Sequence, residues 1–343
     1  MSMAMMNPTK KKRTLVSYAV NLVLTALLFI VLFLLMNTGV MNRYQADLVT
    51  MVCINVILAV SLNLVTGVLG QLVLGHAGFM LVGAYAAALF TKNCGLPLPV
   101  ALPIGLVLAG LLAAVFGIII GIPALRLRGD YLAIITLGFG EIIRVVANNL
   151  KITNGAMGLS GIESLNNREH PAAMFIYAFV LAVLVVFMMF TFGRSRHGRA
   201  VIAIREDEIA AESSGINTTY YKLLAFVMAA FIAGVAGGLY AHQLGLVDPS
   251  KYDFNKSVEI LIMVVLGGMG SITGSIISAT VLTLLPEFLR DFSDYRMLIY
   301  SIILIIVMLF KPTGLLGRYE LSLTKIFRKL FGSRPARKKK GEV

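Results

Sequence analysis

An acidic and a basic side chain stand three residues apart within a mostly apolar stretch of this sequence. Glu141 and Arg144 lie in the predicted helix Tyr131–Ala147, and their spacing puts them on one helical face, where the charges neutralise each other. Charged side chains inside a membrane-spanning helix are costly and usually serve a function. The pair is interpreted in two ways: as part of a translocation path or its gate, or as an ion pair that lies near the membrane surface or faces a partner helix.

A single histidine lies in a glycine-rich stretch that contains no Asp, Glu, Lys or Arg, residues 67–78. A lone histidine among glycines is more often a hydrogen-bonded packing residue than a proton carrier. The apolar segments also lack the series of carboxylates that a proton-coupled carrier needs, which argues against secondary transport. The candidates for a translocation path in this stretch are Gln71, Gly75 and His76. Hydrogen bonds between helices are expected from three amide side chains, Asn55, Asn63 and Gln71.

A polar loop between two apolar runs contains the third candidate site. The segment Arg205–Ser213 favours a short helix with three acidic residues in its first turn, where the helix dipole stabilises them. Two alanines give this helix a small surface, and a glycine is placed to end it. Such a helix can dock into a groove on another protein, although an ordinary interfacial loop helix has the same composition. The residues that we expect to act in docking are Arg205, Glu208, Ala210, Ala211 and Gly215.

The sequence shows none of the common enzymatic motifs. It has no Gly-x-x-x-x-Gly-Lys-Ser/Thr phosphate loop, no His-Glu-x-x-His motif and no nucleophile elbow. Cys53 and Cys94 have neither metal-ligand nor redox spacing. The glycine-rich run Gly267–Gly274 lacks the lysine of a phosphate loop and predicts a helix break that permits close packing. We therefore expect a non-enzymatic chain with no cofactor or metal of its own. Three glycines of this run are further candidates for the path: Gly267, Gly268 and Gly270.

The composition indicates what kind of element must position these residues. Of 343 residues, 58% are hydrophobic and 14% are charged, whereas soluble domains are about 45–50% apolar and about 25% charged. The apolar content is enough for roughly ten spans of about 20 residues. These values exclude a soluble enzyme, a nucleic-acid-binding module and a disordered chain. They predict an all-α, polytopic bundle of transmembrane helices.

The net charge of +13 is concentrated at the two ends of the chain. Residues 1–14 contain three lysines and one arginine, and residues 318–343 contain nine basic residues against two acidic ones. Basic flanks of membrane helices stay in the cytoplasm, so both segments are predicted to be cytoplasmic tails of a transmembrane permease domain, residues 15–317. The tails can also contact anionic lipid, whereas no nucleic-acid partner is expected. The first apolar run has the length of a span and not of a cleavable signal peptide.

The apolar runs predict about ten spans with both termini in the cytoplasm. Basic residues near 126–128 mark one cytoplasmic loop, and residues 193–221 form a second one. The polar loop Asn148–His170 suits the outside. The first seven spans are predicted at Leu15–Met36, Leu48–Val65, a run ending near Phe90, a run ending near Ile122, Tyr131–Ala147, Ala172–Phe192 and Leu223–Gln243.

The last third of the chain contains either one long span or two short ones before the final span, Arg296–Phe310. Glycines interrupt the run Ser257–Leu285 at residues 267–271. Two short spans return the basic carboxyl-terminal segment to the cytoplasm, so the glycine interruption and the charge rule agree on two. Each is about 13–15 residues long, which is short for a bilayer of about 30 Å, so a tilted, extended or re-entrant helix is expected.

Several of these stretches resemble permeases of ABC importers. Glu208–Gly215 resembles their "EAA" coupling loop, Ala-Ala-x-x-x-Gly, with one extra residue between the glutamate and the alanine pair. The stretches Gly70–Tyr85, Arg126–Arg144 and Gly267–Gly274, with Pro312–Gly317 after the last span, resemble the LivM-type permease subunits of branched-chain amino acid importers. Together the similar stretches extend from about residue 50 to residue 317, in the order found in that family.

The resemblance implies a permease subunit that carries leucine, isoleucine and valine across the bacterial cytoplasmic (inner) membrane. It also implies the partners: a second, LivH-type permease, two cytoplasmic ATPase subunits that use the ATP, and a periplasmic or lipid-anchored substrate-binding protein. Importers of urea and short-chain amides belong to the same superfamily, and the sequence does not separate them from importers of branched-chain amino acids. An ion-coupled secondary transporter and a structural membrane scaffold are the alternatives from other classes.

Overall fold

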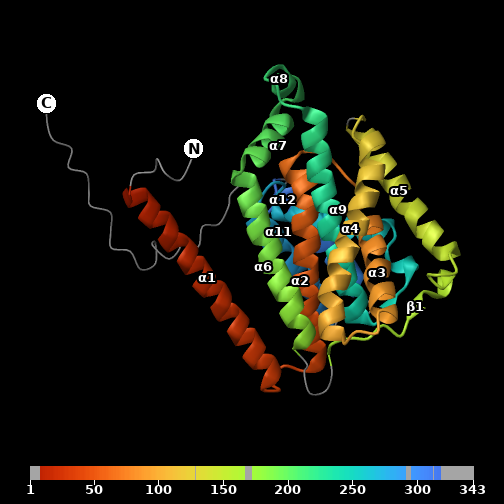
Figure 1. Cartoon of the computed structure of the whole chain (residues 1–343). Helices are drawn as coiled ribbons and strands as arrows, with labels where there is room; N and C mark the ends of the chain where they lie inside the picture. Colours follow the sequence, from red (N-terminus) through yellow and green to blue (C-terminus); the bar gives the residue numbers. More distant parts are fainter. Residues whose placement is uncertain (1–7, 128, 167–171, 291–294, 312, 318–343) are drawn as a thin grey trace, which may run out of the picture.

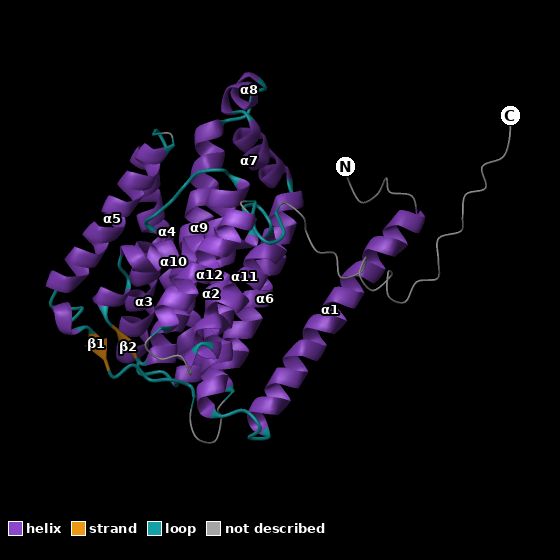
Figure 2. Ribbon diagram, turned by 180° about the vertical axis from the view of Figure 1, so that it is seen from behind, coloured by secondary structure: helices purple, strands orange, loops and turns teal. Residues whose placement is uncertain are grey.

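The structure is a computed structural model of the chain and describes residues 8–127, 129–166, 172–290, 295–311 and 313–317. These residues are almost entirely helical (Figures 1 and 2). Within these ranges the strands form one antiparallel pair, β1 (Leu159–Ser160) with β2 (Leu246–Val247). The predicted all-α class is confirmed. Residues 1–7 and 318–343, which hold most of the predicted tails, lie outside the described residues, as do Arg128 and Pro312.

The predicted spans coincide with helices whose ends differ from the expected ones by a few residues. The first half contains α1 (Pro8–Asn37), α2 (Arg43–Asn63), the π-helical turn η2 (Leu64–Val68), α3 (His76–Asn93), α4 (Leu98–Ala124) and α5 (Asp130–Asn149). The second half contains α6 (Ala173–Arg194), α9 (Thr218–Leu244), α10 (Phe254–Gly267), α11 (Ile272–Phe288) and α12 (Arg296–Phe310). Short helices in the connections are η3 (Gly155–Met157), α7 (Arg196–Glu206), α8 (Glu208–Ser213) and η4 (Pro249–Lys251).

Among the described residues, four helical segments are long and apolar enough to cross a membrane. They are Arg43–Val68, Leu98–Ala124, Ala173–Arg194 and Thr218–Leu244. Shorter apolar helices occur at Val23–Asn37, Ile272–Phe288 and Leu298–Phe310. These lengths and compositions are those of an α-helical, multi-pass membrane protein.

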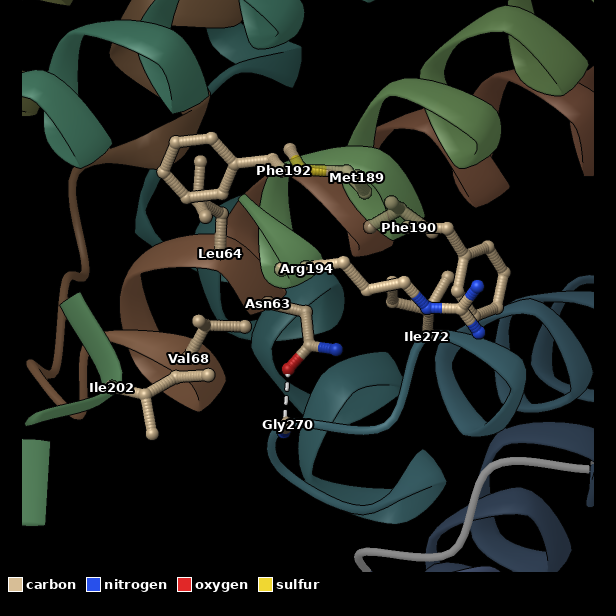
Figure 3. A pocket seen from close by; sticks show the side chains of 12 residues that line it. Asn63, Leu64, Val68, Met189, Phe190, Phe192, Arg194, Ile202, Gly270 and Ile272 are labelled. Atoms are coloured by element: carbon tan, nitrogen blue, oxygen red, sulfur yellow. Dashed lines mark hydrogen bonds between the residues drawn. The ribbon is translucent and has the colours of Figure 1, made fainter. Parts of the chain in front are cut away.

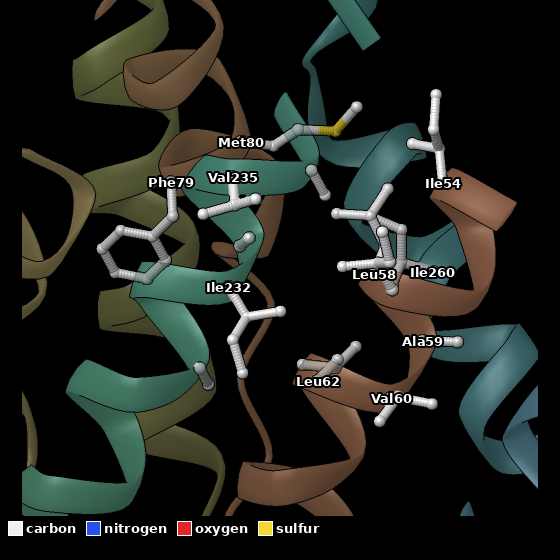
Figure 4. Packing of buried hydrophobic residues seen from close by; sticks show 14 of the residues in the cluster. Ile54, Leu58, Ala59, Val60, Leu62, Phe79, Met80, Ile232, Val235 and Ile260 are labelled. Carbon is white, nitrogen blue, oxygen red and sulfur yellow. The ribbon is translucent and has the colours of Figure 1, made fainter. Parts of the chain in front are cut away.

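Helix α9 lies in the middle of the bundle and packs against α2, α3 and α4. Glycines allow the close approach, because a β-carbon built on Gly237 would lie 1.9 Å from the backbone oxygen of Met80 in α3. A β-carbon on Gly83 of α3 would lie 2.1 Å from the backbone oxygen of Gly234. Large apolar side chains fill the space between α2 and α9, where Figure 4 shows Leu62 facing Ile232.

Helix α1 diverges from the bundle and approaches it near its carboxyl-terminal end (Figure 1). There Phe29 stacks on Phe175 of α6 with ring centroids 5.9 Å apart, and Met36 is buried. The helix begins at Pro8, so residues 8–14, which we predicted to belong to a tail distinct from the first span, are helical. Proline fits the first position of a helix, and the lysines and arginine that follow are good helix formers, so nothing in this segment ends the helix.

Candidate functional site

Two helix breaks lie next to each other near α7. The first separates η2 from α3 and leaves residues 69–75 without helical structure, and the second separates α10 from α11 at residues 268–271. Gly70 and Gly270 adopt φ angles of +79° and +90°, a region that glycine enters without steric strain. The predicted break at residues 267–271 is confirmed, and it divides the run Ser257–Leu285 into two helices.

One amide side chain joins the two breaks. Asn63, the last residue of α2, accepts a hydrogen bond from the Gly270 N–H at 2.8 Å (Figure 3). It also donates one to the Ser271 carbonyl at 3.0 Å. A β-carbon on Gly67 would lie 2.2 Å from the Gly270 nitrogen, so the contact requires a glycine there. We call Asn63, Gly67, Gly70, Gly270 and Ser271 the glycine junction. The hydrogen bonds of Asn63 confirm its predicted role between helices.

The segment that follows α12 packs against the second break. The Leu315 N–H donates to the Leu266 carbonyl at 2.7 Å, and the Leu316 N–H donates to the Gly267 carbonyl at 3.3 Å. These bonds satisfy two carbonyl groups that the end of α10 leaves without helical partners. Glycine-rich stretches that lie far apart along the chain therefore meet in one place, a proximity that the sequence did not predict.

The polar loop of residues 193–221 contains two helices, and the prediction of one helix over Arg205–Ser213 is wrong. Helices α7 and α8 are separated at Asp207, whose backbone is extended with φ −158° and ψ 112°. The Asp207 carboxylate accepts hydrogen bonds from the N–H groups of Ile209 and Ala210 at 2.9 and 3.0 Å. Aspartate is favoured as an N-cap because it satisfies the free N–H groups of the first turn. The three acidic residues, which we predicted to lie in the first turn of a single helix, therefore lie across the boundary between two helices.

Helix α8 projects from the end of the bundle (Figure 1), and it exposes a large apolar side chain. Ile209 is 71% exposed and Ala210 is exposed, whereas Ala211 is only 4% exposed. The expected small surface therefore contains Ala210 but not Ala211, which belongs to the buried core. Gly215 adopts a φ angle of +81° directly after α8 and is placed where the helix was predicted to end.

An ion pair that we did not predict anchors α8 to α9. Lys222 Nζ lies 2.6 Å from Glu208 Oε1, and the two side chains are 4% and 23% exposed. A buried ammonium group is strongly destabilising unless it is paired, so this contact fixes α8 relative to α9. Lys222 directly precedes the apolar run that starts at Leu223, where the sequence does not distinguish it from a solvated flanking charge.

The Arg205 side chain points into the protein. Its side chain is 19% exposed, and Nη1 donates a hydrogen bond to the Gly67 carbonyl at 2.8 Å. Nη2 lies 2.6 Å from the Glu206 carboxylate. The inward direction is possible because Gly70 has no side chain, since a β-carbon there would lie 2.4 Å from Arg205 Cγ.

The candidates around the first break are mostly packed against other helices. His76, at the start of α3, is 2% exposed, and its Nε2 lies 2.8 Å from Ser61 Oγ, which supports the packing interpretation. A β-carbon on Gly75 would lie 2.0 Å from the backbone oxygen of Thr136 in α5. Gln71 is partly exposed, and its Oε1 is buried with no hydrogen-bond partner among the described residues.

Glu141 and Arg144 form the predicted pair on α5. Arg144 Nη2 lies 2.6 Å from Glu141 Oε2, and the side chains are 28% and 33% exposed for Arg144 and Glu141. The second carboxylate oxygen, Oε1, accepts a hydrogen bond from the Phe254 N–H at 3.1 Å, at the start of α10. The carboxylate therefore links α5 to α10. This link was not predicted, because Glu141 and Phe254 are 113 residues apart along the chain.

A sequence profile of the family described as "branched-chain amino acid transport system / permease component" matches residues 44–310. The match includes the glycine junction, α8 and the pair on α5. The chain belongs to this permease family. The glycine junction, α8 and the ion pair on α5 are thus features of a transport permease.

Three relatives of this permease illustrate the family. The high-affinity branched-chain amino acid transport system permease protein LivM of Salmonella typhimurium is 40% identical over 303 residues, which cover 80% of this chain and 70% of the relative. LivM of Escherichia coli K12 is 39% identical over 320 residues, covering 84% and 74%. LivH of the same E. coli strain is 34% identical over 152 residues, covering 43% and 48%. No solved structure matches the chain.

A cavity of about 210 Å³ lies beside the glycine junction of the permease (Figure 3). Its walls come from α2, η2, α6, α7, the turn after α10 and the start of α11. Asn63, Arg194, Gly270 and Ile272 are among the lining residues, and the Arg194 side chain extends toward Ile272. The turn at Gly270 therefore has packed backbone on one side and open space on the other.

Two substitutions at Glu141 are expected to separate its two contacts. Glu141→Gln removes the ion pair but keeps an oxygen that can accept the Phe254 N–H, so the variant should stay close to the wild-type thermal stability. Glu141→Leu removes both contacts and leaves Arg144 without its carboxylate, which should lower stability by about 1–3 kcal/mol. The measurement is the temperature at which half of the tagged protein is lost from the monodisperse gel-filtration peak.

Arg144→Gln serves as the matched control, because it removes the ion pair while the Glu141 carboxylate still accepts the Phe254 N–H. We expect it to resemble Glu141→Gln. Equal stability of Glu141→Gln and Glu141→Leu would contradict a role for the contact between α5 and α10.

Proposed function

We propose that this permease is the membrane subunit of an importer that carries leucine, isoleucine and valine across the bacterial cytoplasmic membrane, driven by ATP hydrolysis on partner subunits. The observation that carries the proposal is the family match over residues 44–310 combined with the projecting helix α8. Its relatives bear the names of high-affinity branched-chain amino acid transport permeases. The permease itself contributes no catalytic group and no cofactor, and the ATP is used by the partners.

Helix α8 is proposed as the docking element for one of two cytoplasmic ATPases. Ile209 offers an exposed apolar anchor, and Ala210 leaves space beside it for a partner surface. The Asp207 cap and the Glu208–Lys222 pair hold α8 in a fixed orientation. A rigid helix with an apolar anchor binds with less loss of conformational entropy than a flexible loop, and it transmits force to the bundle. When the ATPases bind ATP and close, they would then move α7 and α8. This movement would change the side of the membrane to which the translocation path opens.

The outward face of α5 is proposed to meet the second, LivH-type permease and to line the path with it. The Glu141–Arg144 pair is about a third exposed on this helix, and a charged pair is poorly accommodated by lipid. A β-carbon on Gly138 would meet nothing within 4 Å, which leaves room for a close neighbour. Exposed Ile134 and Ile142 flank this glycine. A protein partner or a water-lined path fits this face better than lipid does.

We further propose the predicted topology of about ten spans with both termini in the cytoplasm. The four long apolar segments, the shorter apolar helices and the helix pair α10 and α11 support it, together with the basic residues at both chain ends. In this topology α8 lies in the cytoplasm, on the same side as the tails. The sheet of β1 and β2 then faces outward, toward a periplasmic or lipid-anchored substrate-binding protein.

Co-purification from native membranes tests the proposal. Tagged permease should bring down a second permease and two ATPases, and their ATP hydrolysis should rise when binding protein loaded with leucine is added. Binding protein from the same operon without ligand is the matched control. Stimulation by urea-loaded binding protein alone would support an ATP-driven importer, but one whose substrate is urea. A permease that purifies without any ATPase would contradict the proposal and favour a carrier or a scaffold.

A further inference from the structure

We propose that Arg205 is the positioning residue that transmits movement of α7 and α8 to both helix breaks. The inference rests on the proposed function, in which α8 contacts an ATPase. Arg205 lies in the last turn of α7, two residues before the boundary at Asp207. It is therefore close to the docking helix in the chain, while its side chain lies inside the bundle.

The guanidinium group holds the first break through a backbone carbonyl. Nη1 donates to the Gly67 carbonyl at 2.8 Å. The chain leaves the helix just beyond this residue, and the Gln71 N–H bonds to Val65 instead of to Gly67. A charged donor thus takes the place of a helical amide, and charge-assisted hydrogen bonds are about twice as strong as neutral ones. Movement of α7 is applied directly to the end of η2.

The same side chain lies against the second break. A β-carbon on Gly270 would lie 3.3 Å from Arg205 Nη1, and one on Gly70 would lie 2.4 Å from Arg205 Cγ. The arginine therefore occupies space that exists because both positions are glycine. Asn63 ties Gly270 to the end of α2 by a hydrogen bond, so both breaks respond to one side chain.

The residues around Arg205 leave space for the Gly270 turn to move in one direction. On the α9 side, the Glu208–Lys222 pair ties α8 to the central helix. On the other side of the glycine junction, the cavity of about 210 Å³ is lined by Gly270 and by Ile202 of α7. A displacement of Arg205 can therefore move the Gly270 turn into this cavity without first displacing packed side chains.

Single-cysteine reporters test the transmission in the complete complex in liposomes. Native Cys53 and Cys94 are replaced by alanine, and one cysteine is introduced by Glu212→Cys in α8 or by Met269→Cys in the second break, two exposed positions to which no docking role is assigned. The rate of maleimide labelling is measured with and without a non-hydrolysable ATP analogue. We expect the nucleotide to change the rate at both positions when Arg205 is present.

Arg205→Gln should keep the nucleotide response at position 212 and abolish it at position 269. Arg205→Lys, which keeps the charge but loses the planar group with several donors, should give a reduced response at 269. Gly70→Ala should act like Arg205→Gln, because its β-carbon displaces the arginine while leaving it in the sequence. Arg126→Gln, an exposed arginine in another loop, is the matched control and should keep both responses.

The outcomes separate this inference from the proposed function. A normal response at 269 in both Arg205→Gln and Gly70→Ala would overturn the role of Arg205 and leave ATPase docking intact. Loss of the response at 212 together with loss of bound ATPase would also overturn it, since Arg205 would then act in docking. Absence of any response at 212 in the complex with Arg205 present would contradict the proposed function of α8 and, with it, this inference.

Discussion

Replacing Gly237 with leucine is expected to abolish the yield of folded permease. A β-carbon at this position would lie 1.9 Å from the Met80 oxygen and 3.1 Å from the Ala84 nitrogen, both backbone atoms of α3. No rotation of a side chain relieves such an overlap, so α9 has to separate from α3. Overpacking of a core by ordinary side-chain overlap costs about 1–3 kcal/mol, and overlap with backbone exceeds this range. The measurement is the fraction of tagged protein in the monodisperse gel-filtration peak after detergent extraction.

Gly138→Leu is the matched control for this substitution. It makes the same chemical change in another long helix, but a β-carbon on Gly138 meets nothing within 4 Å. We expect a normal folded yield and a loss of the second permease from the purified complex, because the leucine fills the space left for a neighbour. An equal loss of folded protein in the two variants would contradict the steric explanation.

Ala210→Trp is expected to abolish leucine uptake while leaving the permease folded. Ala210 is exposed on α8 beside Ile209, so a large side chain there enters only the proposed interface with the ATPase. Substitutions at the centre of an interface change binding by about 2 kcal/mol or more, which corresponds to roughly a 30-fold weaker association. The measurements are uptake into ATP-loaded proteoliposomes and the amount of ATPase that co-purifies.

Ala211→Trp distinguishes docking from folding in this prediction. Ala211 is 4% exposed, so the larger side chain has to displace the packing beneath α8 and should lower the folded yield as well as uptake. The neighbouring positions should therefore give different results in the gel-filtration assay and the same result in the uptake assay. Normal uptake by Ala210→Trp would show that α8 is not the docking surface.

The sequence predicted the helices well because their signals are local. Apolar runs of span length and the glycine interruption at 267–271 each lie within one short window, and α12 has the predicted bounds Arg296–Phe310. Amide side chains were also informative, since Asn55 donates to Thr283 of α11 at 2.9 Å as an interhelical hydrogen bond. Gln71 is the exception among the three predicted amides, because its Oε1 is buried and has no hydrogen-bond partner among the described residues, so residue type alone does not determine the bonding.

The arrangement of the candidate site was less predictable because it depends on contacts between distant segments. Gly67 and Gly270 both lie in glycine-rich runs of the sequence, but nothing in the sequence shows that they touch each other. The partner of Lys222 lies 14 residues away, across the turn that connects α8 to α9. The direction of Arg205 depends on space left by glycines in two other segments. Each of these contacts becomes visible only when the chain is folded.

The π-helical turn η2 restricts how the length of this chain can change during evolution. It accommodates a surplus residue between α2 and the first break, and such turns are retained mostly where they place functional residues. Deleting or inserting one residue there would rotate the following residues by about 100° about the helix axis. This rotation would move the Gly67 carbonyl away from Arg205. Insertions and deletions among homologues should therefore avoid residues 64–68. They should collect in exposed connections such as residues 38–42 and 94–97, where no helix is interrupted.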